Sequence, residues 1–542
     1  MSDFMEIGAD DPIKSAWLDA SDFGNGKRVV IVSQGRLLWI EDLQAWAWHD
    51  GLRWSVEAGA MESLRVAHKV IEHIDAEAMA LAEIAENPIA IKERCGQFVT
   101  PEIAQKRVET LRGHAVRSGS AGMTAGMLKQ ARAFLSVRLD QFDVDPLVYN
   151  VRNQTLRFVE KDGKWAVEAR PHDPLDMLMS VANVDYDPDA ACPFWAERLE
   201  MLVPDAEQLA AFKPLYGYTL TGLTSDQSFY VHQGKGGDGK SMTHMALADL
   251  HGDYYRHAGI KTFLQGRDGG GAEHRSDLVR LRGDVRFVTA DEPKRSSVWD
   301  GEIIKQITGS FVTARGANER TEVTFAPRFK FFAECNVIPR APSDDKGFRR
   351  RFKLFMWQVS LDETPQGAMP PDVVLAKLKS EKSGILNWLI EGALEWLSTR
   401  TIPQPAAMKE VLADLWTASS PMLEWMEEWC DTSDRESREY FDALWNHFKD
   451  WAERQGTDIS KITKTRFGTD LTNKQFAGKK DARGKRYRRG IKLRPHSIFD
   501  AGRGEGGSGD VSAPAGPLPP DGATYNQPAV NDGDDYVPGY DD

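Results

Sequence analysis

The sequence predicts an α/β protein of several domains, built around a mainly parallel sheet with flanking helices. Residues 228–357 alternate apolar, strand-like runs with helical stretches, a pattern typical of parallel sheets. Within this region a glycine-rich loop joins the strand-like run Ser228–His232 to the helical pattern Met242–Leu250. With 542 residues, the chain is long enough for about three domains.

Before this sheet, local patterns predict hairpins and helices. The β-branched run Lys27–Ser33 predicts a strand, and the Asp-Gly pairs at 50–51 and 162–163 predict the turns of two hairpins. Residues 61–140 are rich in Ala, Glu and Leu at helical spacing. We therefore expect a mixed helical and β domain over residues 1–205.

After the sheet, the sequence predicts helices and then a basic segment. An apolar stripe predicts an amphipathic helix that begins after Gly384, and residues 408–455 continue the helical pattern. The stripe consists of Ile385, Leu386, Leu389, Ala393 and Leu397. We therefore place a central α/β domain over residues 206–400, a basic C-terminal domain over 401–500 and a tail over 501–542.

The composition excludes several classes of protein. Charged residues make up 27% and hydrophobic residues 41% of the chain, and no apolar run is long enough to span a membrane. The N-terminus lacks the basic and apolar regions of a secretion signal. The four cysteines lie far apart without a CxxC pair, which excludes a zinc ribbon and disfavours a disulfide framework. We expect a cytoplasmic protein with no membrane partner.

The net charge of −13 is an average over unlike segments. Residues 461–494 carry thirteen basic and two acidic side chains, whereas residues 501–542 carry eight acidic and one basic. The latter segment is rich in Gly and Pro and cannot bury enough apolar surface to fold, so we expect it to be disordered. It is either a solubilising tail or a docking peptide. The basic segment indicates a nucleic-acid partner.

The strongest motif lies where the strand meets the helix. Gly234, Gly239, Lys240 and Ser241 match G-x-x-x-x-G-K-[ST], with the strand before and the helix after that this motif requires. Glycines let backbone N–H groups approach phosphates, and the helix N-terminus adds partial positive charge. We expect Lys240 to reach the β- and γ-phosphates of ATP and the Ser241 hydroxyl to bind Mg²⁺. The predicted ATP-binding residues are Gly234, Lys235, Gly236, Gly237, Asp238, Gly239, Lys240 and Ser241.

Two other interpretations of these glycines remain. Gly234, Gly236 and Gly239 also form G-x-G-x-x-G, the fingerprint of dinucleotide-binding folds. The Lys-Ser pair that follows disfavours this interpretation, as does the lack of a clear ribose-binding acid about 20 residues further on. The third interpretation is a chance glycine loop without function, which the flanking strand and helix disfavour.

A nucleotide-hydrolysing enzyme also needs an acidic element at the end of a strand. The apolar run Val285–Ala290 ends in Asp291 and Glu292, 51 positions after Lys240. We expect Glu292 to polarise the attacking water and Asp291 to help hold Mg²⁺. The alternative is that the acidic pair only forms a turn.

Two further polar elements follow along the chain. The strand-like run Arg328–Cys335 ends at Asn336, whose amide can orient the attacking water. Arg349 and Arg350 lie shortly after it within a triple arginine, which is usually a solvated or phosphate-binding surface. Either of the two can instead reach the nucleotide of a neighbouring subunit as an arginine finger.

The order of these motifs between Gly234 and Arg351 resembles that of superfamily III helicases. The resemblance is closest to the phage and plasmid primase–helicase group, which is related to the poxvirus primase–helicase. It covers residues 140–400 well and the flanks loosely. Further stretches that share it are Arg170–Pro174, Val184–Asp189, Cys192–Pro193, Tyr216–Gly222, Leu281–Gly283, Lys305–Gly309 and Gly384–Trp388.

This resemblance implies an AAA+-type P-loop ATPase core that assembles as a ring, usually a hexamer, and translocates on DNA in the 3′ to 5′ direction. By the same resemblance, Lys240 and Ser241 match the phosphate-binding motif, Glu292 the acidic motif and Asn336 the sensor. Arg349 or Arg350 matches the finger.

The resemblance also bears on DNA. The segment Lys305–Arg320 corresponds to the region leading into a DNA-contacting hairpin, which gives Lys305, Arg315 and Arg320 as candidate DNA ligands. Asp238 stands where the group commonly has Asn. No catalytic set of a primase is evident in the sequence, so we expect priming to come from another protein or to be absent.

The basic segment near the C-terminus predicts a second DNA-binding element. Aromatic residues alternate there with lysines and arginines, and Lys485–Arg489 and Gly490–Arg494 predict two strands of a wing after a pair of helices. We expect a winged-helix-like domain that binds DNA phosphates. Its candidate DNA ligands are Lys485, Arg486, Arg488 and Arg489. The alternative is a solvated basic face, or a surface that the acidic tail covers.

Together these observations predict an ATP-dependent replicative DNA helicase of a phage or other mobile element, in the host cytoplasm. It would act on single-stranded and forked DNA as a homo-oligomer, with a separate primase, polymerase or single-strand-binding protein as possible partners. The alternatives are an AAA+ replication initiator or loader that hydrolyses ATP without processive unwinding, and a DNA-binding scaffold with a degenerate nucleotide pocket.

Overall fold

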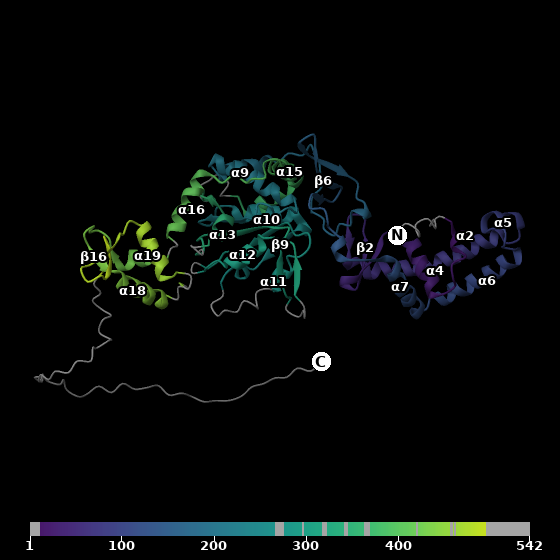
Figure 1. Ribbon diagram of the computed structural model, residues 1–542. Helices are drawn as coiled ribbons and strands as arrows, with labels where there is room; N and C mark the ends of the chain where they lie inside the picture. Colours follow the sequence, from purple (N-terminus) through teal and green to yellow (C-terminus); the bar gives the residue numbers. More distant parts are fainter. Residues whose placement is uncertain are drawn as a thin grey trace, which may run out of the picture. The chain divides into compact units, whose positions relative to one another are not determined.

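The structure is a computed structural model (Figure 1), and it divides into two compact units. The first unit comprises Met1–Met426 and Ala452–Ile459, and the second comprises Glu427–Trp451 and Ser460–Asp542. The residues described are 11–265, 276–294, 297–316, 322–340, 345–361, 369–418, 421–455, 459 and 462–494. Arg320 and the acidic tail, both named in the sequence-based predictions, lie outside these ranges.

The predicted helical region near the N-terminus is confirmed. Its helices are α2 (Pro12–Ser15), α3 (Asp22–Ser33), α4 (Val56–Ile84), α5 (Pro88–Cys95), α6 (Pro101–Ser118) and α7 (Ala121–Leu135). Each of the six begins at a side chain that accepts a backbone N–H of the first turn, from Asp11, Ser21, Ser55, Asn87, Thr100 and Ser120. Their apolar faces form one core.

The strand predicted over Lys27–Ser33 is wrong, because these residues form the second half of α3. Arg28 is fully buried and forms an ion pair with Glu77 of α4 at 2.7 Å. Val29 is buried in the same helical core. Packing between elements far apart in sequence therefore overrides the β propensity of this short run.

Both predicted hairpins are confirmed. Strands β2 (Ala45–His49) and β3 (Trp54–Ser55) flank Gly51, and β6 (Thr155–Lys161) and β7 (Lys164–Arg170) flank Gly163. Both glycines have positive φ, +107° and +74°, as tight turns require. Strands β1 (Leu37–Ile40) and β4 (Ser136–Val137) complete the first sheet, in the order β3-β2-β1-β4, and β5 (Val148–Asn150) completes the second, in the order β5-β6-β7.

The predicted parallel sheet is also confirmed. Its five strands are β8 (Phe229–Gly234), β9 (Tyr255–Ala258), β10 (Phe287–Ala290), β13 (Lys330–Cys335) and β14 (Phe352–Trp357). They lie in the order β14-β8-β13-β10-β9, and every neighbouring pair is parallel. Tyr230 of β8 faces one hydrophobic core, whereas Phe229 and Val231 face another, so the sheet is covered on both sides.

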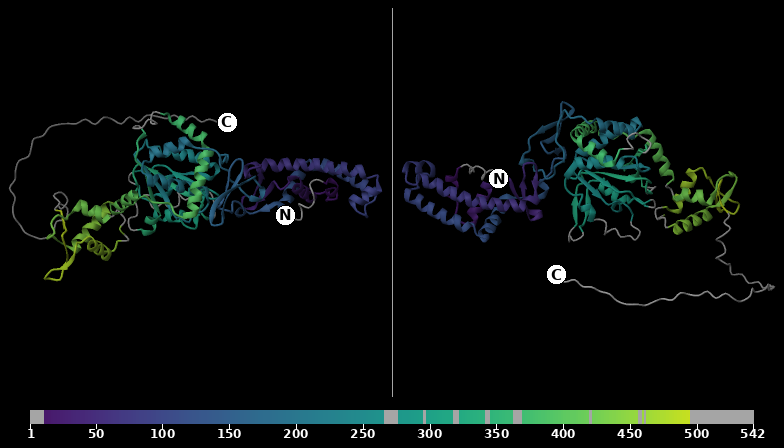
Figure 2. Two further views of the ribbon diagram at one scale, coloured as in Figure 1. Left: turned by 90° about the horizontal axis from the view of Figure 1, so that it is seen from above. Right: turned by 180° about the vertical axis from the view of Figure 1, so that it is seen from behind.

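Helices cover this sheet in the views of Figures 1 and 2. They are α8 (Pro193–Leu202), α9 (Ala206–Gly217), α10 (Lys240–His251), α11 (Ser276–Val279), α12 (Gly301–Ile307), α13 (Lys346–Arg351), α14 (Pro371–Ser380), α15 (Lys382–Thr399) and α16 (Ala406–Ala418). The apolar stripe predicted for α15 is buried throughout. A Cβ at Gly392 would lie 1.9 Å from the Lys213 carbonyl oxygen, so this glycine allows α15 to approach α9 closely. A short hairpin, β11 (Val312–Ala314) and β12 (Val323–Phe325), follows α12.

The region 408–455 is helical only in part. It contains α17 (Pro421–Trp429) and α18 (Phe441–Arg454), but β15 (Cys430–Asp431) and β16 (Arg438–Tyr440) interrupt the predicted helical pattern. The chain then forms α19 (Lys464–Asn473), β17 (Gly478–Lys480), β18 (Arg486–Arg489) and β19 (Lys492–Leu493). No helix among the described residues is long and apolar enough to cross a membrane.

The two basic strands of the second unit form where they were predicted, but they do not pair with each other as a wing would require. Strand β18 pairs with β16 and β17, and β19 pairs with β15. Gly490, between β18 and β19, has a positive φ of +83°, and its backbone N–H bonds the Ser437 carbonyl. The chain therefore leaves the sheet at this residue, and the basic hairpin is β17–β18.

Candidate nucleotide-binding site

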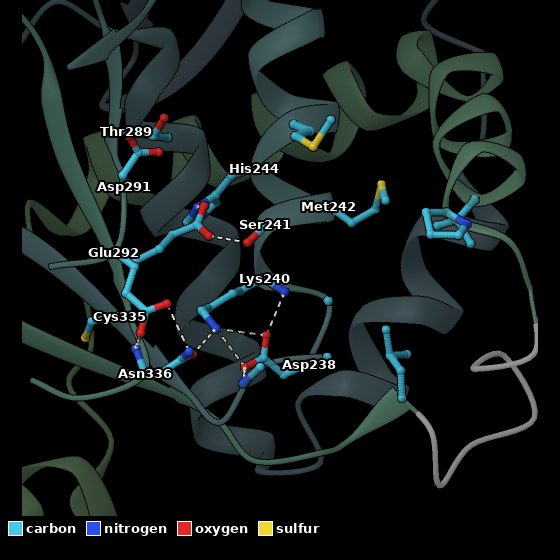
Figure 3. Close-up of a pocket in the computed structure, with 18 of the residues that line it drawn as sticks. Asp238, Lys240, Ser241, Met242, His244, Thr289, Asp291, Glu292, Cys335 and Asn336 are labelled. Carbon is cyan, nitrogen blue, oxygen red and sulfur yellow. Dashed lines mark hydrogen bonds and ion pairs between the residues drawn. The ribbon is translucent and has the colours of Figure 1, made fainter. Parts of the chain in front are cut away.

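A cavity of about 680 Å³ lies at the carboxyl ends of three parallel strands (Figure 3). The loop after β8, the acidic pair after β10 and the end of β13 all line it. Carboxyl ends of parallel strands are where ligands bind in open α/β sheets, and the volume suits a nucleotide-sized ligand. The structure thus brings together the residues Gly236, Gly237, Asp238, Gly239, Lys240, Ser241, Asp291, Glu292 and Asn336.

The glycine loop has the backbone that close approach to a ligand requires. Gly236, Gly237 and Gly239 have positive φ values of +92°, +63° and +79°. Gly239 is also the N-cap residue of α10, whose first residues, Lys240 and Ser241, line the cavity. Such an arrangement favours an anion.

The Asp238 carboxylate shows that the loop suits an anion. It is buried, and it accepts the backbone N–H groups of Gly236 and Lys240, both at 3.2 Å. The Lys240 ammonium lies 2.9 Å from the same carboxylate. The loop donors therefore already converge on one negatively charged group, as they would on a phosphate.

Asn336 connects the loop with the acidic strand end. Its side-chain oxygen accepts a hydrogen bond from Lys240 Nζ at 3.2 Å, and its side-chain nitrogen donates to Glu292 at 3.0 Å. The backbone N–H of Asn336 donates to the other oxygen of Glu292, also at 3.0 Å. Glu292 is therefore held by two donors at the rim of the cavity, beside Lys240.

Asp291 lines the same cavity but faces another partner. Its side chain is 72% exposed and lies 3.1 Å from His257 Nε2. Asp291 and Glu292, although adjacent in sequence, thus point to different groups: Asp291 to a histidine of β9 and Glu292 to Asn336 of the neighbouring strand end.

Two further residues of this site, Glu334 and His244, were not predicted from the sequence. The Ser241 hydroxyl donates to Glu334, and His244 Nδ1 lies 2.7 Å from the other Glu334 oxygen. Burial raises the pKa of Glu334, but the hydrogen bonds from His244 and Ser241 and the charge of Lys240 together hold it below its usual value. The available signal was a single carboxylate near the end of strand β13, after the apolar residues Phe331, Phe332 and Ala333.

Arg349 and Arg350 lie on α13, and neither lines the cavity. The Arg349 guanidinium lies over the Trp416 ring at 5.5 Å, and Arg350 is exposed. Arg351 instead donates to Thr308 and to the Gly347 carbonyl. Within one protomer, these arginines are not brought to the nucleotide site.

The DNA ligands predicted in the first unit lie on separate elements. Lys305 of α12 forms an ion pair with Asp345 at 2.7 Å, and Arg315 directly follows β11. Arg320 lies outside the described residues.

The DNA ligands predicted in the second unit differ in their surroundings. Arg488 donates to the Gly468 and Phe476 carbonyls and to the Thr472 hydroxyl, so it joins α19 to the β17–β18 hairpin. Arg489 pairs with Glu436. Lys485 and Arg486 are exposed, and Arg486 lies directly opposite Lys480 in the hairpin. Like charges opposite each other destabilise a hairpin, which favours a functional reason for them.

The donors around the cavity suit Mg²⁺ held together with phosphates. The Ser241 hydroxyl and the carboxylates of Asp291, Glu292 and Glu334 are oxygen donors of the kind Mg²⁺ prefers. No cluster of three or more acidic, His or Cys ligands occurs in the described part of the chain. Mg²⁺ usually takes only one or two protein ligands and completes its shell with phosphate and water, so this donor set fits.

Comparisons with known proteins match parts of this chain. Residues 27–204 match the family model described as "D5 N terminal like". A "putative helicase" of Acanthamoeba polyphaga mimivirus is 31% identical over 156 residues, and another of Frog virus 3 (isolate Goorha) is 24% identical over 157 residues. These stretches cover 29% and 28% of this chain, and 16% of each viral protein.

Among solved structures, the C-terminal region of NrS-1 in its apo form is similar, with a TM-score of 0.35 and 12% sequence identity. The match covers 63% of this chain and 94% of that chain. A score of this size does not establish a shared fold.

These findings confirm the resemblance to the primase–helicase group. The D5 N-terminal-like match lies within the predicted N-terminal domain, and the viral relatives are named as helicases of large DNA viruses. Since the matched stretch spans only 16% of those relatives, the activity of the whole viral proteins is not established for this chain.

Proposed function

We propose that this chain is the ATP-hydrolysing motor of a DNA helicase, with Mg·ATP bound in the cavity between the glycine loop and the ends of β10 and β13. The observation that supports this most is the convergence of Lys240, Asn336 and Glu292, which come from three separate segments and are joined by hydrogen bonds at one cavity. The resemblance to proteins named as helicases supports the substrate class.

In this proposal each residue has a defined chemical task. The N–H groups of Gly236 and Lys240 and the Lys240 ammonium bind phosphate oxygens in place of the Asp238 carboxylate. Glu292, oriented by Asn336, accepts a hydrogen bond from the water that attacks the γ-phosphorus. The water oxygen bonds the γ-phosphorus while its proton passes to Glu292. The bond from the γ-phosphorus to the β–γ bridging oxygen breaks, so ADP leaves with that oxygen and inorganic phosphate is formed. When bound, Mg²⁺ supplies positive charge at the phosphates.

The proposed motor is a ring of identical subunits. Arg349 and Arg350 lie outside their own protomer's cavity, which supports a role at the nucleotide of a neighbouring subunit. An arginine supplied by another subunit stabilises charge that develops during phosphoryl transfer. Such an arrangement makes ATP hydrolysis depend on assembly.

The second unit is proposed to bind DNA. The hairpin β17–β18 and the residues after it, 478–494, carry nine basic side chains and one acidic side chain. The order helix, two short strands, two helices and hairpin (α17, β15, β16, α18, α19, β17–β18) supports a winged-helix-like domain. Phosphate contacts from the exposed Lys480 and Arg486 suit binding that does not depend on base sequence.

A replication initiator or loader is the second candidate, because the same ATPase site and basic hairpin suit it equally. Assays on DNA forks with 3′ or 5′ single-stranded tails separate the two functions. The proposed helicase releases a strand when it hydrolyses ATP, whereas a loader hydrolyses ATP without strand release.

The decisive variant is Lys240→Ala. We expect it to abolish DNA-stimulated ATP hydrolysis and strand separation, because it removes the ammonium group that faces the phosphates. Lys261→Ala is the matched control, since Lys261 is an exposed lysine of the same unit away from the cavity. Full activity of Lys240→Ala would refute the proposed site.

A further inference from the structure

A second carboxylate, that of Glu334, lies at the metal end of the proposed ATP site. Glu334 projects from β13 and lines the cavity together with Ser241. Its side chain is 15% exposed, compared with 72% for Asp291. A carboxylate that is shielded from water interacts more strongly with a nearby cation than an exposed one does.

Both oxygens of Glu334 are engaged by one face of α10. Oε2 accepts the hydroxyl proton of Ser241, and Oε1 lies 2.7 Å from His244 Nδ1. Ser241 and His244 are three residues apart on this helix and so share a face. The two contacts fix both the position and the rotation of the carboxylate.

The contact with Ser241 also orients the serine. A hydroxyl has one proton and two lone pairs. Because the proton of Ser241 is directed at Glu334, the lone pairs are left for another partner. A serine held in this way is prepared to bind a cation through its oxygen.

A buried relay holds His244 in turn. Its Nε2 lies 3.1 Å from the Tyr216 hydroxyl. Since Glu334 needs a donor, His244 directs a proton on Nδ1 to it and turns Nε2 toward the Tyr216 hydroxyl. Burial keeps the pKa of Tyr216 well above its usual value, with a further contribution from the charge of Glu334, so this hydroxyl stays a donor.

The relay ends in the core of the sheet. The Trp357 indole can only donate, and it donates to His232 Nδ1 at 3.0 Å. His232 therefore carries its proton on Nε2, and burial together with the charges of His244 and Lys240 keeps its pKa well below the usual value. Tyr216 lies 3.5 Å from the same His232 Nδ1, so its shorter contact, with His244, takes the proton.

We propose that Glu334, rather than Asp291, is the carboxylate that serves the bound Mg²⁺, by orienting the Ser241 hydroxyl toward the metal. His244 and Tyr216 are positioning residues that hold Glu334. This inference rests on the proposed ATP site. It keeps Ser241 of α10, which the sequence motif also assigns to the metal, and replaces Asp291 after β10 by Glu334 of β13.

The test is the effect of Mg²⁺ on the affinity of the full chain for a fluorescent ADP analogue, measured with Mg²⁺ and with EDTA. In Glu334→Gln the side-chain amide keeps only one acceptor oxygen. Either Ser241 or His244 therefore faces an N–H group and loses its hydrogen bond. We expect the gain in affinity that Mg²⁺ gives to fall by about 10- to 100-fold, as losses of residues behind a metal ligand do. The affinity in EDTA should stay within about twofold, since the glycine loop is unchanged.

Direct metal binding provides a second readout. Mn²⁺ binding to the ADP complex, measured by electron paramagnetic resonance, should weaken in Glu334→Gln more than in Asp291→Asn. A larger loss in Asp291→Asn would overturn the assignment. His244→Gln keeps a donor toward Glu334 and should retain more Mn²⁺ affinity than His244→Ala, whereas equal losses would remove His244 from the relay.

The outcomes separate this inference from the proposed function. If the wild-type chain binds no nucleotide in Mg²⁺ or in EDTA, the proposed ATP site is wrong. If it binds and Mg²⁺ strengthens binding equally in wild type and Glu334→Gln, only the assignment of Glu334 is wrong. Thermal unfolding shows whether each variant folds. If Glu334→Gln does not fold, the conservative Glu334→Asp replaces it, and the gain in affinity that Mg²⁺ gives is compared with that of the wild type.

Discussion

At the carboxyl edge of the central sheet the charged side chains surround a cavity, whereas at the amino edge they are packed against protein atoms. Arg286, just before β10, bonds both oxygens of Asp284 and the Val148 and Leu220 carbonyls. Lys330, at the start of β13, donates to the Thr221 carbonyl and is buried. The charge of Arg286 is paired with Asp284, whereas Lys330 donates to carbonyl and hydroxyl oxygens.

Buried charges occur at both edges, but they indicate a ligand-binding site at only one of them. Both edges contain groups with displaced pKa values: burial, with the charge of Arg286, keeps the pKa of Lys330 well below its usual value, and Glu334 is shifted at the other edge. The cavity at the carboxyl edge has a volume of about 680 Å³, whereas the cavity beside Lys330 at the amino edge has a volume of only about 10 Å³. A displaced pKa is therefore informative about function when the group also faces space for a ligand.

The amino edge should respond to mutation with the largest loss of stability. Arg286→Met leaves the carboxylate of Asp284 buried with only Arg328 near it, at 3.4 Å. Removing one partner of a buried ion pair costs about 3–5 kcal/mol of unfolding free energy. Urea unfolding measures this loss, and Arg282→Ala, at an exposed arginine nearby, is the control. A loss as small as that of the control would show that this edge does not stabilise the fold.

The carboxyl edge should respond with a loss of chemistry and little loss of stability. Glu292→Gln keeps the shape of the side chain but removes the acceptor charge beside the proposed water. We expect the rate of ATP hydrolysis to fall by about 100-fold or more, with nucleotide affinity retained. Steady-state hydrolysis and equilibrium binding check this together. A variant that hydrolyses ATP at the wild-type rate would exclude Glu292 as the proposed base.

A smaller effect is expected at Asp238, the internal anion of the glycine loop. Asp238→Asn removes a negative charge that competes with phosphates for Lys240 and the loop N–H groups. We expect ADP to bind about fivefold more tightly in EDTA, equivalent to about 1 kcal/mol. Titration of a fluorescent ADP analogue measures the change. Weaker binding in this variant would mean that Asp238 supports the nucleotide rather than competing with it.

A pH dependence of stability is also expected at the amino edge. Burial and the charge of Asp284 raise the pKa of Asp143 to about 7. The pKa of this carboxyl is about 4 in the unfolded chain. Its contribution to stability is therefore fully present below about pH 4 and is lost as the pH rises through about 7. The side chain in Asp143→Asn stays neutral at every pH. The melting temperature of this variant, relative to that of the wild type, should therefore rise between pH 5 and pH 8. A difference independent of pH would contradict this.

Local sequence patterns predicted much of this architecture. The parallel sheet, the two Asp-Gly hairpins and the α15 stripe followed from short-range patterns, and the glycine loop lies at the predicted junction. The loop, the acidic pair and Asn336 could be expected to meet because each follows a parallel strand, and such strand ends lie at one edge.

Long-range contacts explain what the sequence did not predict. The run Lys27–Ser33 is helical because Arg28 meets Glu77, 49 residues away. Ser241 meets Glu334 across 93 residues, a pairing that no local motif encodes. The basic strands β18 and β19 were expected to pair with each other because they are adjacent in sequence. Instead, β18 pairs with β16 and β19 pairs with β15.

The central claim is that the cavity binds ATP through the glycine loop. Calorimetric titration of Mg·ATP into the full chain and into Lys240→Ala tests it most directly. Loss of a charged hydrogen-bond donor removes about 1.5–3 kcal/mol, so we predict binding at least about tenfold weaker in the variant, with Lys261→Ala unchanged. Equal affinities in the wild type and Lys240→Ala would contradict the claim.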